Sequence, residues 1–585
     1  MKSDRLLLAI VACAVVIRLI SFVATLTVGA GEAVLVEDDA GGYVSLASHL
    51  VAGDGFVTLN ETTGLLEPER FRSIGLPLLL VPFMFVSHGV VWWGVFLSIV
   101  AGIALPLLVY AIGRRLFTEY VALGAAAATA VEPHLVWFSW LPLTEIPFIL
   151  CAFGALWLLI RVENPSWLSY VGAGLLLGYS ILLRPPYLFV FAALLLCVAI
   201  WYVWHRRYQS VLSMAVLVIG MILILAPWSI RNMLISGSPA LSGMGWYNVY
   251  VDYLASVRSV DNATLFTDEK EILRSNPPAG MTRDDLMNPA FAGTLRTAAL
   301  AELWERRATV VALETAALFS FFTNDGYFYY LEEFGLIPRA SEKGLEHSIT
   351  FAVLSGGSAG SAIVHELQRQ YFIPLFGRAL TLGILLLALI GVVTRRDSWT
   401  LFFSSAILLT ALVSTAVGLG VQARLRVPVQ PFLFLLAGTG VVFLLRMRCA
   451  APILTFVRLH GAQIIRFCIS GGTAATAGAL TVYLLTDIGG LWYLFSSIVS
   501  FVVATIIAFS LQKYWTFRER STHRIPIQTT QGLALVLFNS MMNIVLIYIL
   551  VDVAHIHYVL AQCLVYALIG AIDFFVYKFV IFKQS

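Results

Sequence analysis

The chain has 585 residues, of which 59% are hydrophobic and only 12% are charged, whereas ordinary soluble domains carry roughly 25% charged residues. Soluble cores stop growing near about 250 to 300 residues, so this composition excludes a soluble enzyme and predicts a protein covered largely by lipid. The net charge of +3 gives no indication of nucleic-acid binding. The six cysteines lie in or beside apolar runs without CxxC spacing, which indicates packing residues and no disulfide framework.

Hydropathy predicts ten membrane-spanning helices in the larger, N-terminal part of the chain and four in the last part. Their approximate ranges are 6–28, 89–112, 119–138, 146–161, 167–183, 186–204, 209–230, 375–393, 398–420, 426–445, 464–486, 491–512, 530–551 and 558–580. The segment 73–87 contains two prolines and is too short to cross, so we expect a helix lying at the membrane surface. The predicted fold class is an all-α polytopic membrane protein with about 14 spans, an amphipathic external helix and a small external domain.

The basic residues of the short connections predict how these helices are oriented. With the N-terminus inside, the most basic short connections all fall on the cytoplasmic side, as is typical of inner loops. These inner residues are Arg114, Arg115, Arg161, Arg206, Arg207, Arg395, Arg396, Arg446, Arg448, Lys513, Arg518, Arg520 and Arg524. We therefore expect a multi-pass protein of the cell (inner or plasma) membrane with both termini in the cytoplasm. The acidic 29–73 loop and the 231–374 segment then lie outside, where the latter should form a small, mainly helical domain.

Two adjacent carboxylates, Asp38 and Asp39, precede a segment in which apolar residues from Tyr43 to Leu50 share one helix face. The pattern predicts an amphipathic helix on the outer membrane surface that begins at a carboxylate pair. A carboxylate in this place suits a general base that acts on a lipid-bound substrate. The alternative is that Asp38 or Asp39 is the N-cap of the helix and is stabilised by the helix dipole.

Six arginines recur at predicted helix ends on the outer side, where basic residues are not expected. They are Arg70, Arg72, Arg184, Arg231, Arg424 and Arg426. Arginine suits phosphate binding because its forked donors are rigid and its charge does not titrate away, so the set indicates an external anionic substrate. The alternative for any one of them is snorkelling, in which the side chain reaches from a helix end to the lipid headgroups.

Two further outer residues are candidates for the same site. Glu145 lies at the outer start of a predicted helix, in the sequence LPLTEIP. His134 follows Pro133 in an external turn, where we expect a histidine that makes a local hydrogen bond and binds no metal. The sequence has no metal-ligand spacing. No cofactor is assigned, and a divalent cation stays an open alternative.

Six short motifs occur in order between residue 1 and about residue 445. They are D-A-x-x-Y-x-x-x-A-x-x-L at Asp39 to Leu50, R-x-x-G-x-P-L-L-L from Arg72, the pair Thr144 and Glu145, G-L-L-L-G-Y-x-x-L-x-R-P-P ending at Pro186, P-W-x-I-R-N at Pro227 to Asn232, and R-x-R-x-P-x-x-P at Arg424 to Pro431. No single motif is specific. In this order they resemble the GT-C glycosyltransferases, in particular the ArnT and protein O-mannosyltransferase-like group, which takes sugars from polyprenyl phosphate.

The resemblance implies that the first external loop carries the catalytic aspartate. Asp39 would act as general base on the acceptor hydroxyl, with Asp38 as the alternate and Glu145 as a further candidate. The donor phosphate would be bound by Arg70, Arg72, Arg184, Arg231, Arg424 and Arg426, and the donor and acceptor would be lined by Tyr43, Asn232 and His134. Positive charge at these positions would lower the barrier where negative charge builds up on the departing phosphate.

Residues 451–585 are expected to form a second unit, which follows residues 1–450 at the basic connector 445–465. The motif K-aromatic-x-x-F occurs in it twice, at Lys513–Phe517 and Lys578–Phe582. A duplicated helix pair is typical of small transport modules, although lysine and aromatic residues at a membrane boundary also serve as anchors. From Ile465 to Phe582 the unit resembles the GtrA-like family, whose members are associated with moving polyprenyl-phosphate sugars across membranes.

The sequence therefore predicts a membrane glycosyltransferase that transfers a sugar from a polyprenyl-phosphate donor at the external face, fused to a GtrA-like unit that flips or holds the donor. The alternative is a lipid-linked sugar flippase without transferase activity. It would account for the intramembrane polar residues Asn539, Asn543 and Asp573, which packing hydrogen bonds explain equally well. The sugar stays open, and the acceptor is a lipid, a glycan or a protein. No nucleic-acid partner is expected.

Overall fold

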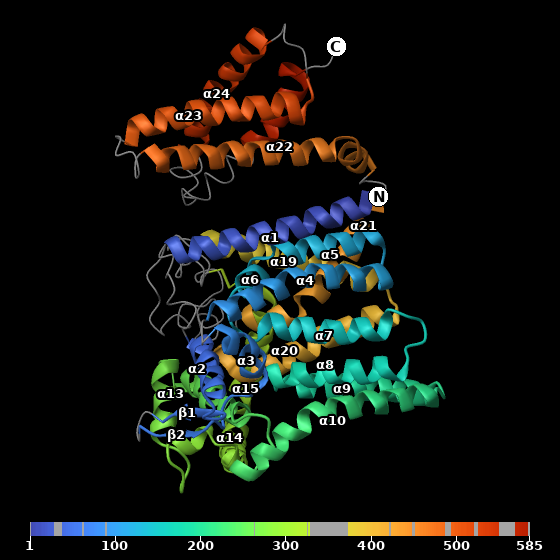
Figure 1. Ribbon diagram of the computed structural model, residues 1–585, viewed down its shortest axis with the longest axis vertical. Helices are drawn as coiled ribbons and strands as arrows, with labels where there is room; N and C mark the ends of the chain where they lie inside the picture. The colour runs from blue at the N-terminus through green and yellow to red at the C-terminus, as the bar shows by residue number, and fades with distance from the viewer. Residues whose placement is uncertain are drawn as a thin grey trace. The chain divides into compact units, whose positions relative to one another are not determined.

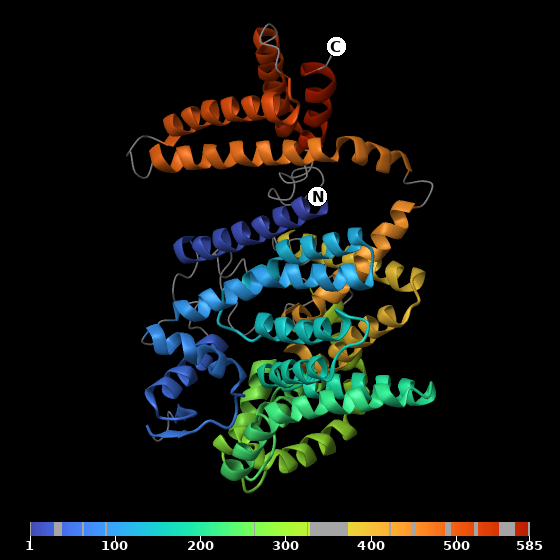
Figure 2. The same ribbon diagram turned by 45° about the vertical axis from the view of Figure 1, so that its right-hand side comes forward.

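The computed structural model describes residues 2–28, 38–60, 64–87, 91–262, 264–324, 326–327, 372–420, 423–446, 451–485, 493–519, 525–548 and 568–582. These residues are almost entirely helical and divide into two compact units (Figures 1 and 2). Unit 1 comprises Met1–Glu366 and Ile373–Phe443, and unit 2 comprises Leu367–Phe372 and Leu444–Ser585.

Ten apolar helices form the bundle of unit 1, and each coincides with one of the ten spans predicted there. They are α1 (Lys2–Val28), α4 (Trp92–Leu116), α5 (Glu119–Val131), α7 (Glu145–Ile160), α8 (Trp167–Leu183), α9 (Tyr187–Trp204), α10 (Tyr208–Ser236), α19 (Phe372–Thr394), α20 (Ser398–Ser414) and α21 (Gln430–Arg446). Figure 1 shows α4, α7, α8 and α9 side by side.

Seven segments among the described residues are long and apolar enough to cross a membrane. Helices α5, α7 and α8 have 13, 16 and 17 residues, fewer than the roughly 20 that a membrane span needs. The multi-pass membrane character predicted from hydropathy is therefore confirmed, whereas the predicted count of about 14 spans is not.

Several short elements lie at one end of the bundle. They are α2 (Asp38–Ala52), β1 (Val57–Leu59), β2 (Leu66–Pro68), α3 (Gly75–Ser87) and α6 (Pro133–Trp137). The strands form an antiparallel ribbon in which Val57 lies opposite Pro68 and Leu59 opposite Leu66. This ribbon is a small departure from the all-α prediction. Helix α3 coincides with the predicted surface helix.

Polar caps explain why several bundle helices begin where they do. Thr118, Ser166 and Asp397 precede α5, α8 and α20, and each accepts a hydrogen bond from a backbone N–H in the first turn of its helix. Such caps satisfy amide groups that have no partner within the helix. Helix α10 is followed by its C-cap, Gly237, which has a φ of 68°. Glycine adopts this left-handed conformation without strain because it has no Cβ.

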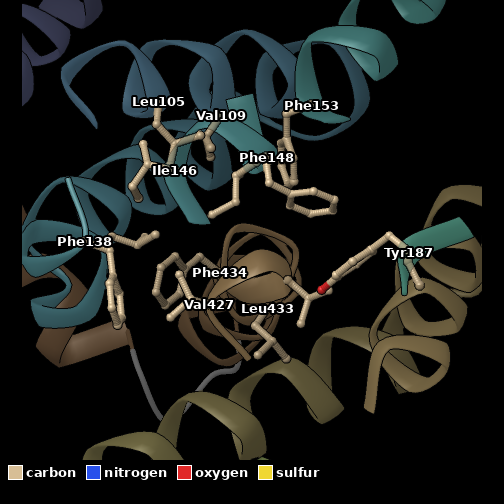
Figure 3. Packing of buried hydrophobic residues seen from close by; sticks show 14 of the residues in the cluster. Leu105, Val109, Phe138, Ile146, Phe148, Phe153, Tyr187, Val427, Leu433 and Phe434 are labelled. Carbon is tan, nitrogen blue, oxygen red and sulfur yellow. The ribbon is translucent and has the colours of Figure 1, made fainter. Parts of the chain in front are cut away.

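The main core of unit 1 lies where α4 and α7 pack against the segment 423–446, near the C-terminal end of the unit. Figure 3 shows Leu105 and Val109 of α4 and Phe148 and Phe153 of α7 facing side chains of α21 and of the 3₁₀ helix η7 (Ala423–Val429). The ring of Phe153 stacks on Phe432 with a centroid distance of 4.4 Å. This packing holds the first residue of α7 and the first residues of η7 close together, although they are far apart in sequence.

Helices α8 and α10 approach more closely than helices with large side chains can. A Cβ atom at Gly174 would lie 2.1 Å from the carbonyl oxygen of Leu217, and one at Gly220 would lie 2.6 Å from that of Val171. Because neither glycine has a Cβ, the two backbones come into direct contact, as is common in membrane helix pairs. This contact holds α10 directly against α8.

The segment after α10 forms a compact helical cluster in its described residues, as predicted for the 231–374 region, although α10 itself continues to Ser236. Its elements are α11 (Met244–Tyr247), η2 (Asn248–Tyr253), α12 (Leu254–Asn262), α13 (Phe266–Ser275), η3 (Asp284–Met287), η4 (Pro289–Phe291), α14 (Ala292–Glu305) and α15 (Arg307–Thr323). They pack around the buried residues Tyr247, Leu254 and Leu286. A connecting 3₁₀ helix, η6 (Thr415–Gly420), follows α20.

Unit 2 contains the long helix α22 (Ala451–Tyr483), α23 (Tyr493–Ser510) and α24 (Ile525–Tyr548). Both copies of the K-aromatic-x-x-F motif lie on π-helices, η10 (Leu511–Thr516) and η12 (Tyr577–Ile581). In each copy the final phenylalanine is buried, and the rings of Phe517 and Phe582 lie 5.3 Å apart. The sequence repeat therefore corresponds to a repeated backbone feature. Such π-helices are rare in proteins overall, but those that occur are often found at functional sites.

Candidate functional site

Five charged side chains from separate parts of unit 1 meet at the end of the bundle that carries α2. The Asp39 carboxylate lies 3.8 Å from Nη2 of Arg72 and 3.2 Å from Nη1 of Arg424. Glu145 Oε1 lies 2.5 Å from Nε of Arg424 and 3.2 Å from Nη1 of Arg184. Arg424 thus bridges the two carboxylates. We call these five residues the acid–arginine cluster.

Four members of the acid–arginine cluster lie at the start or end of a helix, and the fifth lies in a turn between two elements. Asp39 is in the first turn of α2 and Glu145 is the first residue of α7. Arg184 is the C-cap of α8, and Arg424 is the second residue of η7. Arg72 follows β2, in the turn before α3. Helix ends converge here because the apolar bodies of the helices pack with one another and leave the polar ends at one face.

Exposure separates the two carboxylates. The side chain of Asp39 is 40% exposed, whereas that of Glu145 is fully buried. A substrate can therefore reach Asp39, while Glu145 serves as a buried anchor for Arg424 and Arg184. With three arginines and two carboxylates, the cluster carries a net charge of +1, which favours binding of an anion.

Tyr43 lies one helical turn after Asp39 and faces the same cluster. The Arg72 guanidinium carbon is 5.9 Å from the centre of its ring. Desolvation, reinforced by the charge of Asp39, raises the pKa of the Tyr43 hydroxyl to about 12. Tyr43 is therefore a hydrogen-bond donor at neutral pH.

Arg231 and Asn232, at the end of α10, bind backbone atoms. Arg231 donates from Nη1 to the carbonyl oxygen of Glu69 at 2.8 Å and from Nη2 to that of Phe56 at 3.2 Å. Its guanidinium lies 4.8 Å from the Trp228 ring centre. The Asn232 side chain donates to the carbonyl oxygen of Ala240 at 2.7 Å. Both side chains hold the loops that surround the cluster.

Asp38 directly precedes Asp39 of the cluster in sequence, and Arg70 lies two residues before Arg72. The carbonyl oxygen of Arg70 accepts from the N–H of Gly243 at 3.0 Å, and among the described residues its Nε has no hydrogen-bond partner. Asp38 begins α2, and its side chain lies outside the described residues.

Arg426, two residues after Arg424, points to another element. It donates to the carbonyl oxygens of Phe321, Phe322 and Asn324 at 2.7, 3.0 and 2.9 Å. These groups are at the C-terminal end of α15, where carbonyls have no partner within the helix. Arg426 therefore caps α15.

His134 belongs to a second buried polar group, on α6. Its Nδ1 lies 2.8 Å from Oε1 of Glu132, and its ring stacks on that of Tyr327 with a centroid distance of 5.4 Å. Burial opposes the ionisation of Glu132, but His134, the N–H of Leu135 and Arg426 hold the pKa of the carboxyl below its usual value. The hydrogen bond from His134 is the local contact expected from its place in the turn.

An open, mainly apolar cavity of about 500 Å³ lies between the ribbon, α3, α8 and α10. Its lining includes Phe56, Ile74, Leu78, Leu182, Trp228 and Arg231. Ile235, near the end of α10, also lines it and is 38% exposed. The cavity is suited to an apolar chain, because only Arg231 brings a charged group into its lining.

Glu69 is a site residue that the sequence analysis did not single out, although it falls within the acidic 29–73 loop. Its side chain is 3% exposed. Oε1 accepts from the N–H groups of Phe71 and Arg72 at 2.7 Å each. A carboxylate side chain can accept hydrogen bonds from the backbone N–H groups two and three residues further along the chain, and this local pattern is the signal that could have identified the turn from the sequence. In the described part of the chain, no group of three or more His, Cys, Asp or Glu residues could hold a metal ion.

Two segments of the chain match known protein families. Residues 73–230 match dolichyl-phosphate-mannose-protein mannosyltransferase, and residues 466–582 match the GtrA/DPMS transmembrane domain. The chain thus has one segment similar to a mannosyltransferase family and another similar to the GtrA/DPMS transmembrane domain. Both resemblances identified from the sequence are confirmed. The mannosyltransferase match begins at Ser73, directly after Arg72, and contains Glu145 and Arg184. The GtrA/DPMS match contains both K-aromatic-x-x-F motifs.

Solved structures of membrane glycosyltransferases are similar to the chain at low identity. ArnT from Cupriavidus metallidurans, bound to undecaprenyl phosphate, has 13% identity and a TM-score of 0.39, over 97% of this chain and 76% of ArnT. The apo oligosaccharyltransferase of Archaeoglobus fulgidus has 15% identity and a TM-score of 0.42, over 90% of this chain and 59% of its own. AglB of the same organism, in complex with an inhibitory peptide and a dolichol-phosphate, has 15% identity and a TM-score of 0.42, over 87% of this chain and 56% of AglB. The sequence matches no curated protein.

Proposed function

We propose that residues 1–450 form a glycosyltransferase domain that moves a sugar from a polyprenyl-phosphate donor to an acceptor, and that residues 451–585 form a GtrA-like domain that holds or flips the donor. The observation that carries the proposal is Asp39, an accessible carboxylate between Arg72 and Arg424. The match of residues 73–230 supports it, since that family is named for a lipid-phosphate sugar donor.

The chemistry follows from the arrangement of the acid–arginine cluster. Asp39 accepts the proton of the acceptor hydroxyl while the hydroxyl oxygen forms a bond to the anomeric carbon of the sugar. The bond from that carbon to the donor phosphate oxygen breaks, and its electron pair leaves with the phosphate. Negative charge grows on the phosphate in the transition state, where Arg72 and Arg424 stabilise it. Buried Glu145 holds Arg424 in place and needs no contact with substrate.

The apolar chain of the donor is proposed to occupy the 500 Å³ cavity between α3, α8 and α10. Arg231 lines this cavity and donates to the carbonyl oxygen of Glu69, three residues before Arg72. A lipid chain in the cavity would therefore bring its phosphate toward Arg72. An isoprenoid chain is suited to this lining because burial of apolar surface is favourable for any hydrocarbon.

The acid–arginine cluster is proposed to face the outside of the cell membrane, with both termini in the cytoplasm, as the basic inner loops predict. Cysteines introduced in a cysteine-free chain at Asp284 and Glu163, both exposed, test the orientation. A membrane-impermeant maleimide added to intact cells should label position 284 and leave position 163 unlabelled. The reverse pattern would overturn the proposed sidedness.

A flippase without transferase activity is the second candidate, and buried polar groups in unit 2 favour it. Lys513 is fully buried and donates to Oε1 of Gln528. Asn539 donates to both carboxylate oxygens of Asp573, at 2.8 and 3.0 Å. Polar groups within membrane segments often mark a transport path.

The deciding experiment measures sugar transfer by purified full-length protein. Radiolabelled mannose and glucose esters of undecaprenyl phosphate are supplied with a membrane lipid extract as acceptor, and labelled product is counted. Asp39→Asn should lower the rate at least about 100-fold, because removal of a general base costs this much or more. Asp54→Asn is the matched control, because Asp54 is an exposed aspartate of the same region that pairs with His49 outside the cluster.

The outcomes separate the candidates. Transfer by wild type that is lost in Asp39→Asn and kept in Asp54→Asn supports the proposal. Full activity in Asp39→Asn with loss in Asp38→Asn would move the base to the alternate residue, and full activity in both variants would remove the aspartate mechanism. Lipid flipping in proteoliposomes without any transfer would favour the flippase.

A further inference from the structure

The turn from Glu69 to Arg72 is built on one carboxylate oxygen. Glu69 Oε1 accepts from the backbone N–H of Phe71 and from that of Arg72, each at 2.7 Å. The side chain is 3% exposed, so water does not compete for these hydrogen bonds. Charge-assisted bonds of this length are among the strongest in proteins. The direction in which Arg72 leaves the turn therefore depends on the Glu69 side chain.

The backbone of Glu69 is held from the opposite side. Its N–H donates to the carbonyl oxygen of Phe56 at 3.0 Å, and its carbonyl oxygen accepts from Nη1 of Arg231 at 2.8 Å. Arg231 is itself fixed by Phe56 and by the face of Trp228. Glu69 thus joins the end of α10 to the turn that carries Arg72.

Arg72 reaches Asp39 through a narrow gap beside α2. A Cβ atom at Gly42 would lie 2.8 Å from Cζ of Arg72, so the guanidinium passes where any other residue would place a side chain. The closest approach of Arg72 Nη2 to Asp39 is 3.8 Å, near the limit of an ion pair. A shift of Arg72 by about 1 Å would therefore decide whether the pair exists, and shifts of that size in positioning groups cost about 100-fold in rate.

We propose that Glu69 is a positioning residue for the transfer reaction: its carboxylate sets the direction of Arg72 toward Asp39 and the departing phosphate. The inference rests on the proposed function of the acid–arginine cluster. Glu69 touches none of the reacting groups. It acts through the amides of Phe71 and Arg72, while Arg231 on the far side holds the same residue by its carbonyl oxygen.

Three variants of the full-length protein test this role with the transfer assay described above. Glu69→Ala removes the acceptor, and we expect the rate to fall between about 10-fold and about 100-fold. Glu69→Gln keeps a carbonyl oxygen that can accept from both amides, and we expect it to retain activity within about threefold of wild type. Glu67→Ala is the control, because Glu67 lies on the same ribbon and its side chain accepts a hydrogen bond from the side-chain amide of Asn60, away from the turn that carries Arg72.

A double variant shows whether Glu69 acts through Arg72. If it does, Glu69→Ala combined with Arg72→Ala should be no slower than Arg72→Ala alone, since the two changes remove one effect. Multiplying losses would overturn the inference, as would an inactive Glu69→Gln or a fully active Glu69→Ala.

Hydrogen exchange provides a measurement that does not depend on activity. In Glu69→Ala the amides of Phe71 and Arg72 should exchange at least about tenfold faster than in wild type, because each loses its acceptor. In Glu69→Gln they should stay protected. If wild type shows no transfer with any donor while these amides respond as expected, the proposed function fails and the turn geometry stands. If wild type is active and the amides do not respond, the positioning role fails alone.

Discussion

Arg424 and Arg426 show how much two nearby arginines can differ. Arg424 bridges Asp39 and Glu145 within the acid–arginine cluster, whereas Arg426 donates to three carbonyls at the end of α15. Both are at the start of the same predicted helix and suit phosphate equally well by composition. Only their partners separate a group that can meet substrate from one that holds a neighbouring helix.

The first prediction concerns this pair. Arg424→Lys keeps the positive charge but loses the planar fork that reaches both carboxylates, so we expect the transfer rate per folded molecule to fall about tenfold. Arg426→Lys leaves carbonyls of α15 without donors, which costs about 1 to 3 kcal/mol, so the unfolding temperature should fall while the rate per folded molecule stays near wild type. Transfer assays and thermal unfolding of both variants check this. A wild-type rate in Arg424→Lys would contradict it.

At the scale of elements, ion pairs hold the helices after α10 together. Arg258 on α12 binds Glu302 on α14 with two hydrogen bonds of 2.7 and 2.6 Å. Arg306 also lies 3.2 Å from this carboxylate. Hydrogen bonding from Arg258, with a smaller contribution from Arg306, holds the pKa of Glu302 below its usual value of 4.5, although burial acts in the opposite direction. The bidentate geometry makes this pair stronger than a typical surface pair.

The second prediction is a loss of stability in acid. A carboxylate whose pKa is lowered by folding contributes stability above its unfolded pKa, and this contribution disappears as the pH falls through the folded pKa. Lowering the pH from about 6 to about 3 should therefore remove roughly 1 kcal/mol from the α12–α14 contact. Glu302→Gln should be less stable than wild type near neutral pH and should lose less on acidification.

Tryptophan fluorescence during thermal unfolding measures this effect, because Trp246 packs against the same core. Glu271→Gln is the control. Its pair with Arg283 is more than half exposed on both sides, so its removal should leave the pH dependence unchanged. An equal acid loss in Glu302→Gln and wild type would show that other groups are responsible.

At the scale of the molecule, the two compact units correspond to two family matches, in residues 73–230 and 466–582. The unit boundary falls between Phe443 and Leu444, close to the basic connector. All five residues of the acid–arginine cluster belong to unit 1. If unit 2 only holds or flips the donor, the transfer chemistry should not need its covalent attachment.

The third prediction tests that division in the folded, full-length chain. A protease site inserted between Arg446 and Ala451 is cut after purification in detergent. With donor supplied in the detergent, we expect the cut protein to transfer sugar at about the wild-type rate, because donor delivery is bypassed. In sealed vesicles with donor only on the inside, transfer should depend on unit 2. Loss of transfer in detergent, with unit 1 still folded, would show that unit 2 takes part in the chemistry.

Apolar runs in the sequence were enough to predict the ten apolar helices of unit 1 and a helix at the position of α3. Hydrophobic length determines a membrane helix locally, so no knowledge of neighbours is required. The same holds for the repeated lysine motif, whose residues already occur together in sequence. Asp39, Arg72, Glu145, Arg184 and Arg424 were likewise identifiable from the sequence as charged residues at or near predicted helix ends.

Which of these ends meet was decided only by tertiary structure. Arg424 and Glu145 are 279 positions apart, and helix packing, not sequence order, brings η7 against the start of α7. The same packing directs Arg426 to α15 and Arg231 to backbone carbonyls. It also buries Glu69 where one oxygen holds two amides. A guanidinium looks the same in sequence whether it faces a phosphate, a carboxylate or a carbonyl, because its role depends on the partners that the fold brings within hydrogen-bonding distance.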